Sequence, residues 1–385
     1  MRAWINANET IREDDHATVQ AAIRLAVEEN CRKVVIPRYN ARTKRMVWSF
    51  DRAIELPSNF TLVLDNCFLE QAPGSYENLI TNERSHDLEY SDKPENEARN
   101  IAVLGEGNVT LSGGVHNHLL EKTTRKYGLG RMFHQPILFW HNVRGLRVEN
   151  LHFENFRWWC ILHVMVSHAV LRNLDFFAVP HVPNLDGIDL RLGCHHFFIE
   201  NVTGRTGDDT IALTGLMGKS EVDYLVEGQE IDIRDVRIRN LKADGNRCYL
   251  IRLLNHDGCR EYGIEADVVM DASDWSDGNL NNAAIAVGSP YYFAKTPSVP
   301  GDTRDLRFSN IYARGKAVLA LNHTIRDSYF TNVHPFGTCG PLINSFEEGC
   351  DFDNVTVGPA YVGPDGIGTG NGSFETGKEA LTWRS

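Results

Sequence analysis

A short pattern recurs along the chain at irregular intervals of 22 residues and more. Each copy is a run of alternating apolar residues, then Asn or Asp, then Leu or a β-branched residue. The copies are "LRVENLHFEN", "AVLRNLDFFA", "FFIENVTGRT", "IDIRDVRIRN", "LRFSNIYARG", "SYFTNVHPFG" and "CDFDNVTVGP". The polar marker falls at Asn150, Asn173, Asn201, Asp235, Asn310, Asn332 and Asn354. Such a period predicts one coil per repeat, with loops of variable length on some coils.

The repeat predicts stacked parallel strands, because its copies lack the tight two-residue turns that an antiparallel meander needs. Asn suits a bend in each coil, since it tolerates left-handed backbone, and stacked Asn side chains would form a ladder between coils. Residues 15–30 place apolar residues at helical spacing behind a cap candidate at Asp15, which predicts a capping helix. We therefore expect an all-β, right-handed parallel β-helix in which residues 1–385 form a single domain. An antiparallel β-sandwich array is the alternative.

Three long stretches interrupt the repeat, at residues 84–100, 115–135 and 270–302. Insertions in a solenoid project sideways from the coils. Where several insertions lie on one face, they form the walls of a groove. We expect these three stretches to lie on the groove side of the molecule.

Composition and charge narrow the functional classes. The 39 basic and 51 acidic residues give a formal net charge of −12, which does not favour nucleic acid as a partner. No stretch has the apolar length of a membrane span or a signal peptide. We therefore expect no membrane partner and a cytoplasmic protein if Met1 is the native start; a trimmed chain would instead be extracellular or periplasmic. The eight cysteines form no CxxC pair, which favours buried free thiols over disulfides or metal ligands.

Four aspartates gather within "NLDGIDLRLGCHHFFIENVTGRTGDDTIAL", at Asp186, Asp189, Asp208 and Asp209. Asp186 and Asp208 are 22 residues apart, about one coil, so the two pairs are expected to meet on coils about 4.8 Å apart. Close carboxylates cannot all ionise normally, and one is pushed towards its protonated form. A protonated acid beside ionised bases is what glycosidic hydrolysis requires. Two other interpretations stay open, turn residues and Ca²⁺ ligands, although the spacing does not match an EF-hand.

A family resemblance rests on the same residues. "NLDGID" followed by "TGDDTIAL" resembles the paired signatures of the polygalacturonase family, glycoside hydrolase family 28, and "ATVQAAIRLAVEENCRKVVIP" and "NVTLSGG" are similar to its flanking segments. The resemblance covers most of residues 10 to 255. It implies an inverting β-helix hydrolase that uses no metal or cofactor. By matching position, Asp208 would be the general acid, Asp186 and Asp209 would hold and deprotonate the attacking water, and Asn184 would bind substrate.

The family's substrate-recognition motifs are altered in this chain. No histidine occurs between Asp209 and His256, where the family has a Gly-His-Gly turn, and "IRLL" keeps Arg252 but places Leu254 where a lysine would hold a uronate carboxylate. We expect Arg252 and His256 to bind the substrate, a pectic or related oligo- or polysaccharide. Galacturonate, a modified uronide, a rhamnosyl linkage and a neutral sugar all stay open at the cleavage site. Asp189 is expected to support a turn.

Two other functions fit the same fold. A Ca²⁺-dependent polysaccharide lyase would release unsaturated products and lose its activity to a chelator. A non-catalytic β-helix that binds glycan or belongs to a larger assembly would keep its ligand affinity in an Asp208→Asn variant.

Overall fold

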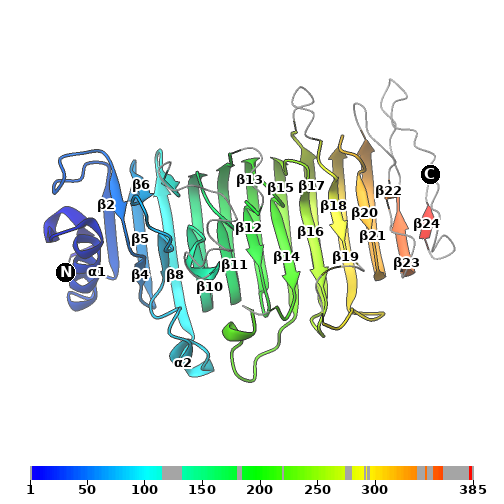
Figure 1. The fold of residues 1–385 in the computed structure, drawn as a ribbon, viewed down its shortest axis with the longest axis horizontal. Helices are drawn as coiled ribbons and strands as arrows, with labels where there is room; N and C mark the ends of the chain where they lie inside the picture. The colour runs from blue at the N-terminus through cyan, green and yellow to red at the C-terminus, as the bar shows by residue number, and fades with distance from the viewer. Residues whose placement is uncertain are drawn as a thin grey trace.

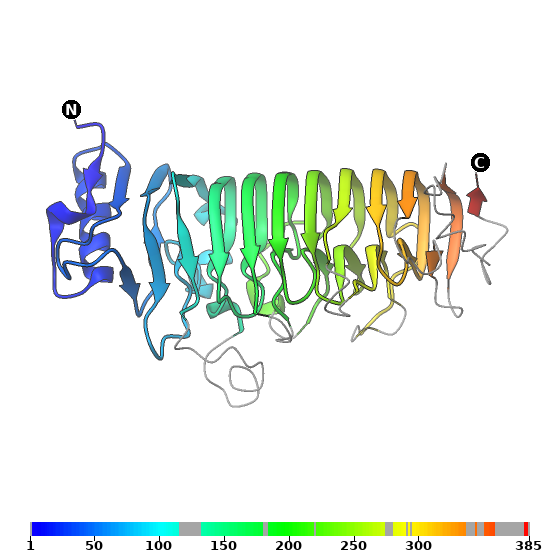
Figure 2. The same cartoon turned by 90° about the horizontal axis from the view of Figure 1, so that it is seen from above.

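The protein is described by a computed structural model, with the strands stacked in coils along its long axis (Figures 1 and 2). It describes residues 2–114, 132–179, 184–218, 221–273, 280–289, 292, 295–335, 343–344 and 350–358, and the backbone of 381–383. The strands pair in parallel from one coil to the next. The predicted right-handed parallel β-helix is therefore confirmed, and the antiparallel sandwich is wrong.

The strand β10 (Leu138–Glu154) shows how a coil is built. It pairs with three different earlier strands: β7 (Ile80–Asn82) at its start, β8 (Ala98–Glu106) in its middle and β9 (Thr110–Ser112) at its end. A coil therefore consists of three straight runs, and stacking the coils gives the solenoid a first, a second and a third face.

The first face carries the residues of functional interest. Beyond β10 it continues through the start of β11 (Ile161–Phe177), then β12 (Ile188–Leu190), β14 (Ile211–Gly215), β16 (Tyr249–Asn255), β18 (Ala283–Val287), β20 (Leu319–Leu321) and β22 (Ile343–Asn344). One register column of this face is fully buried and lines the core: Ile188, Ile211, Ile251 and Ile285. Since neighbouring residues of a strand point to opposite sides, the next column faces outward: Asp189, Ala212, Arg252 and Ala286.

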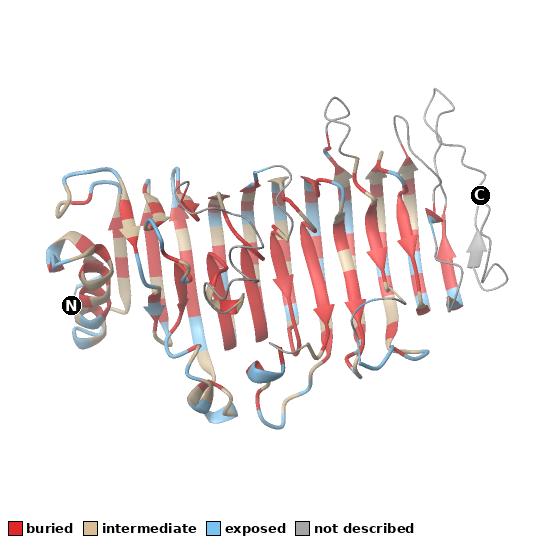
Figure 3. Ribbon diagram, in the orientation of Figure 1, coloured by how far each residue is buried: buried red, intermediate tan, exposed pale blue. Residues whose placement is uncertain are grey.

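The second face contains the longer runs. These belong to β2 (Lys33–Pro37), β5 (Phe60–Asp65), β8, β10, β11, β13 (His195–Arg205), β15 (Ile233–Asp244), β17 (Glu261–Asp271), β19 (Thr303–Ala313), β21 (Thr324–Pro335) and β23 (Asp351–Val357). The remaining strands are β1 (Ile5–Asn6), β3 (Trp48–Phe50), β4 (Ile54–Leu56), β6 (Phe68–Gln71) and β24 (Leu381–Trp383). Buried residues follow the inside of the coils along the solenoid (Figure 3).

The helix α1 (Asp15–Glu28) closes the N-terminal end of the stack, beside β2 (Figure 1). Its buried side includes Val19, Ala22, Ile23 and Ala26, as the helical spacing predicts. The cap differs from the prediction by one residue: Asp14 accepts a hydrogen bond from the Ala17 N–H at 2.6 Å. Asp15 is buried instead and accepts hydrogen bonds from Asn40, Arg42 and Ser49.

The predicted asparagine ladder is present between the second and third faces. The Asn173 side-chain amide donates to Asn150 at 2.7 Å, Asn201 donates to Asn173 at 2.8 Å, and Asn240 donates to Asn201 at 3.1 Å. These residues have positive φ angles, a left-handed conformation that Asn adopts more readily than most residues.

Two of the predicted markers are wrong, because the coil has a second left-handed position. Asp235 lies opposite His196 at the start of the second face, and the ladder passes through Asn240 instead. Asn354 lies opposite Asp327 in the same second column and donates to it at 2.6 Å. On the next coil after Asn240, the ladder position is occupied by Val268, with φ 59°.

The three stretches that were predicted to be insertions contain more regular secondary structure than expected. Residues 84–100 form α2 (Leu88–Ser91) and a 3₁₀ turn before β8 begins. Only part of the stretch 270–302 is an insertion, because it contains β18, a strand of the first face. Most of 115–135 lies outside the described residues, and Met132–His134 forms a 3₁₀ turn.

The described part of the chain bears on two further expectations. Cys67, Cys160, Cys194 and Cys259 are buried free thiols, as expected, and Cys31 and Cys248 are half-buried free thiols. Within the residues that the structure describes, no helix is long and apolar enough to cross a membrane.

Candidate active site

The two aspartate pairs meet where the chain enters the first face. Asp186 lies two residues before Ile188, and Asp209 lies two residues before Ile211. Because Ile188 and Ile211 are register partners on neighbouring strands, the two aspartates lie on adjacent coils. The Gly187 N–H donates to the Asp209 carbonyl at 3.0 Å. The expected stacking is confirmed, with Asp186 aligned to Asp209 rather than to Asp208. We call Asp186, Asp189, Asp208 and Asp209 the aspartate cluster.

Glycine is required at position 187 for this close approach. A Cβ atom there would lie 2.6 Å from the Thr210 carbonyl oxygen and 3.1 Å from the Thr206 methyl group. Both contacts are shorter than ordinary van der Waals separation, so a side chain would push the two coils apart. Gly187 therefore sets the spacing between Asp186 and Asp209.

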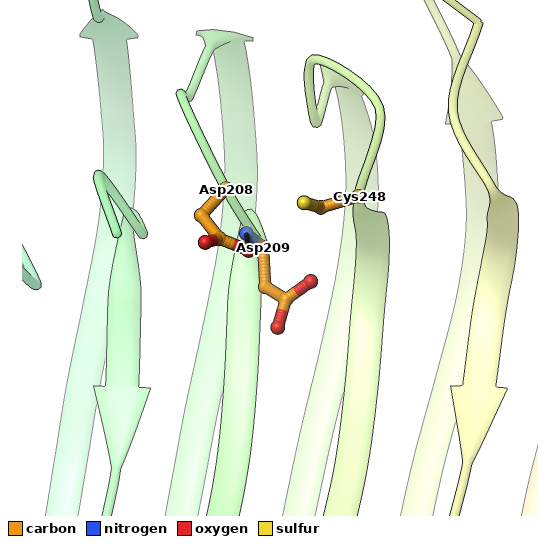
Figure 4. Close-up of side chains that lie close together, drawn as sticks. All are labelled: Asp208, Asp209 and Cys248. Atoms are coloured by element: carbon orange, nitrogen blue, oxygen red, sulfur yellow. Dashed lines mark hydrogen bonds between the residues drawn. The ribbon is translucent and has the colours of Figure 1, made fainter. Parts of the chain in front are cut away.

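Asp208 is the only half-buried member of the cluster, since the other three aspartates are buried. Its carboxylate accepts hydrogen bonds from the backbone N–H groups of Asn184 and Asp209, both at 3.1 Å. Asn184 thus contacts the cluster through its backbone, in a left-handed conformation with φ 58°. The Cys248 thiol faces the same carboxylates, at the entry to the next strand (Figure 4).

Asp209 is held by the following coil. One carboxylate oxygen accepts a hydrogen bond from the Tyr249 N–H at 3.2 Å, and the other accepts one from the Arg252 guanidinium at 2.9 Å. The guanidinium also lies over the Tyr292 ring, 4.9 Å from its centre. The structure brings Arg252 to the cluster, as predicted, but its charge is already paired with Asp209.

Asp189 belongs to a strand, so its prediction as a turn residue is wrong. It lies in β12 on the outward side of the first face and accepts a hydrogen bond from Arg191 at 2.8 Å. The Arg191 guanidinium stacks on Trp159 at 3.9 Å and approaches Glu221 at 3.6 Å. The sequence interpretation missed Arg191, although "IDLRL" alternates polar and apolar residues as a one-sided strand does.

Burial and mutual repulsion perturb the buried carboxyl groups. The pKa of Asp186 is raised well above its ordinary value, first by burial and then by the charges of Asp189, Asp208 and Asp209. One Asp186 oxygen is buried and accepts no hydrogen bond from the residues that the structure describes. Burial also raises the pKa of Asp189 to about 7 and that of Asp209 to about 6, each moderated by its arginine. Burial and the neighbouring charges therefore favour the protonated form of Asp186, whereas Arg252 favours the ionised form of Asp209.

His256 lies at the other end of β16 from the cluster. The strand begins with Tyr249, which contacts Asp209, and His256 follows its last residue. The buried ring donates from Nε2 to the Ser289 carbonyl at 2.9 Å and accepts from the Ser298 N–H at 3.1 Å. His256 thus fixes the loop after β18, and the structure does not bring it to the aspartates.

Three of these side chains have the atoms of a metal site. Ligand atoms of Asp208, Asp209 and Cys248 lie within 4.8 Å of one another. A thiol must lose its proton to bind a metal. Burial and the nearby Asp208 and Asp209 charges raise the pKa of Cys248, so the thiol would have to release a proton before it could join the two carboxylates as a ligand.

A cover lies over the N-terminal side of the first face. It consists of residues 84–96, 132–134 and 221–227, which contact one another: the Glu227 N–H donates to the Asp92 carbonyl at 2.9 Å. The Tyr224 ring packs against Phe139 and His141 of β10, with ring centres 5.4 and 5.1 Å apart, and its hydroxyl is 2.8 Å from His86 Nδ1. The sequence interpretation missed the 221–227 part of this cover.

Known structures share this fold. The chain is similar to the hyperthermoactive exopolygalacturonase of Thermotoga maritima, with a TM-score of 0.61 and 15% identity over 92% of this chain and 90% of that one. It is also similar to the A-module of the mannuronan C-5 epimerase AlgE6 of Azotobacter vinelandii, with a TM-score of 0.56 and 12% identity over 92% and 86%. A third similar structure is the tailspike of Escherichia coli bacteriophage HK620 in complex with a hexasaccharide, with a TM-score of 0.55 and 10% identity over 93% and 66%.

The similarity extends to the fold alone. No protein-family model and no curated protein matches the chain. Because the similar structures include a hydrolase, an epimerase and a tailspike, activity has to be argued from the side chains of this chain.

Proposed function

We propose that the protein is a glycoside hydrolase that cleaves an oligo- or polysaccharide with inversion at the aspartate cluster. The observation that carries the proposal is that adjacent carboxyl groups have unequal surroundings: Asp186 is buried and one of its oxygens accepts no hydrogen bond from the described residues, whereas Asp209 is paired with Arg252 at 2.9 Å. A proton donor and an ionised base side by side are the two groups that this reaction needs.

Asp208 donates the proton to the leaving oxygen in this proposal. Its half-buried position supports that role, because a general acid must reach the glycosidic oxygen. Asp186 and Asp209 hold and deprotonate the attacking water. Because burial raises the pKa of Asp186, Asp209 is the better base of the two, and Asp186 is the group that holds the water in place.

A neutral sugar at the cleavage site is the substrate that the contacts favour. The two arginines of the site, Arg191 and Arg252, are each paired with a cluster aspartate, at 2.8 and 2.9 Å. Leu254, which aligns with a uronate-binding lysine, is fully buried. Four aspartates facing two paired arginines repel a uronate carboxylate.

The cover supports cleavage close to one end of the glycan. Phe139 and Leu162, which are in register with Asp189 on the outward side of the first face, have no exposed surface. A chain of sugars that crosses the cluster therefore extends towards β16 and β18, where Arg252 and Tyr292 are exposed in part.

Reducing-end release from a panel of neutral and acidic plant oligosaccharides, with a chelator present, tests the proposal. The wild type is expected to release sugar from a neutral or rhamnosyl substrate, Asp208→Asn is expected to be inactive, and Asp353→Asn, at an exposed position on β23, is the matched control. Activity that the chelator abolishes, or release by Asp208→Asn at the wild-type rate, would contradict the proposal.

A further inference from the structure

A second group of titratable side chains lies on the second face, away from the aspartate cluster. We call it the basic cluster: Arg144, His168, His195, His196 and Arg234. Arg144, Ser167, His195 and Arg234 are register partners on four successive coils, about 4.8 Å apart per coil. His168 follows Ser167 directly, in a left-handed conformation with φ 58°.

The cationic groups are in contact with one another. The ring centres of His168 and His196 are 4.7 Å apart, and those of His195 and His196 are 5.1 Å apart. An Arg144 guanidinium nitrogen is 3.4 Å from His168 Nε2. Asp235 pairs with Arg234 at 2.6 Å and with His196 at 3.1 Å, so the charge at one end of the cluster is neutralised within the protein.

A cavity of about 240 Å³ opens beside Arg144 and His168. Among the described residues, its lining consists of Arg99, Asn100, Arg144, Gly145 and His168, none of which is a carboxylate. Arg99 is the register partner of Arg144 on the preceding coil. Two guanidinium groups and an imidazole thus surround one small space.

The charges of this cavity are incompletely neutralised. Arg99 pairs with Glu97 at 2.9 Å, whereas Arg144 and His168 take part in none of the ion pairs found among the described residues. The pKa of His168 is lowered, first by partial burial and then by Arg144, His196, His195 and Arg234. Burial and the neighbouring basic groups thus both favour the neutral imidazole of His168.

A metal ion does not explain the cluster. Among the residues that the structure describes, the three histidines do not form a group whose ligand atoms lie within 4.8 Å of one another. The two arginines would also repel a cation.

We propose that the cavity formed by Arg99, Arg144 and His168 binds a compact oxyanion. Guanidinium groups match the oxygens of phosphate, sulfate and carboxylate with paired N–H donors, and the imidazole adds a third donor. The same chemistry is supplied by a free inorganic anion or by an acidic group on a glycan. The site lies on a different face from the aspartate cluster, so it does not depend on the proposed hydrolysis.

Histidine-resolved NMR with inorganic phosphate and, separately, a sulfated oligosaccharide as probes tests the site. Saturable shifts of the His168 ring are expected, with dissociation constants at least tenfold weaker in Arg144→Gln. His168→Asn, which keeps a residue suited to left-handed backbone, is expected to weaken binding when followed by calorimetry. Arg237→Gln is the control, because this exposed arginine of the same face pairs with Glu265 at 3.4 Å and lies outside the cavity lining.

The two probes distinguish the sources of the anion. Binding of phosphate alone supports a site for a free anion, and at least tenfold tighter binding of the oligosaccharide supports a site for an acidic glycan. Absence of a saturable His168 shift with both probes overturns the proposal, as does equal weakening by Arg144→Gln and Arg237→Gln.

Discussion

The guanidinium of Arg252 donates a hydrogen bond to the Asp209 carboxylate at 2.9 Å, from one coil of the solenoid to the next. Both groups lie on the first face, and Asp209 has no exposed surface. The ion pair favours the ionised form of Asp209, whereas burial and the neighbouring carboxylates raise the pKa of Asp186, one coil earlier. This division of charge underlies the proposed chemistry.

Replacing Arg252 with Gln should leave Asp209 as a buried carboxylate without a counter-charge. Removing one partner of a buried ion pair costs about 3 kcal/mol of unfolding free energy or more, and the pKa of Asp209 should rise because Arg252 lowers it. If ionised Asp209 acts as a base, the acidic limb of the pH–rate profile moves to higher pH. Chemical denaturation and pH–rate profiles check both effects, with Arg237→Gln as control; an unmoved acidic limb would count against a base role.

Stability should fall as pH rises from about 4 to about 8. The ordinary pKa of Asp189 is 3.8, and its pKa in the fold is about 7, so between these values the folded chain binds more protons than the unfolded chain. We expect the free energy of unfolding to fall by roughly 2–4 kcal/mol over this range. The raised pKa of Asp186 contributes in the same direction. Denaturation at several pH values measures this fall. In Asp189→Asn the free energy of unfolding should fall less steeply with pH. A slope equal to that of the wild type would exclude Asp189 as a source of the pH dependence.

Substrates with different leaving groups distinguish the aspartate that acts as the general acid from those that act as bases. An aryl glycoside with an acidic leaving group needs little help from a general acid. Asp208→Asn should therefore regain most of its kcat on such a substrate, whereas Asp186→Asn and Asp209→Asn should stay inactive. Rescue of Asp186→Asn instead would assign the acid to Asp186, the carboxyl group whose pKa burial raises well above its ordinary value.

Val268→Asn should stabilise the protein by about 1 kcal/mol, because a β-branched residue in left-handed backbone is strained by that order. The introduced amide would also reach the Asn240 side chain of the preceding coil, as the other ladder residues reach theirs. The reverse change, Asn240→Val, should destabilise by a similar amount. Thermal and chemical unfolding of both variants measure the effect, and a destabilised Val268→Asn would show that the ladder ends here for another reason.

The coil repeat was predictable because each bend requires a residue that tolerates left-handed backbone, and Asn150, Asn173 and Asn201 meet this requirement. The pattern failed at Asp235 because "IDIRDVRIRN" has polar residues at both left-handed positions. Alternating apolar residues cannot tell which of the two bends a marker occupies.

The aspartates of the site and Arg252 were predictable from the sequence, and the other partners were not. Asp186, Asp208 and Asp209 follow from two short clusters one coil apart. To predict that Arg191 contacts the cluster, one has to know which side of β12 faces outward. The cover forms because Tyr224 packs against His86 and Phe139, which are distant from it in the sequence. Such contacts between distant segments leave no local pattern.

Incorporation of oxygen from ¹⁸O-labelled water into the product tests the proposed hydrolysis most directly. With a substrate from the oligosaccharide panel, the wild type should place one labelled oxygen on the newly formed reducing end, and Asp208→Asn should release no labelled sugar. Unsaturated products without label, or labelled sugar from Asp208→Asn at the wild-type rate, would contradict hydrolysis by the aspartate cluster.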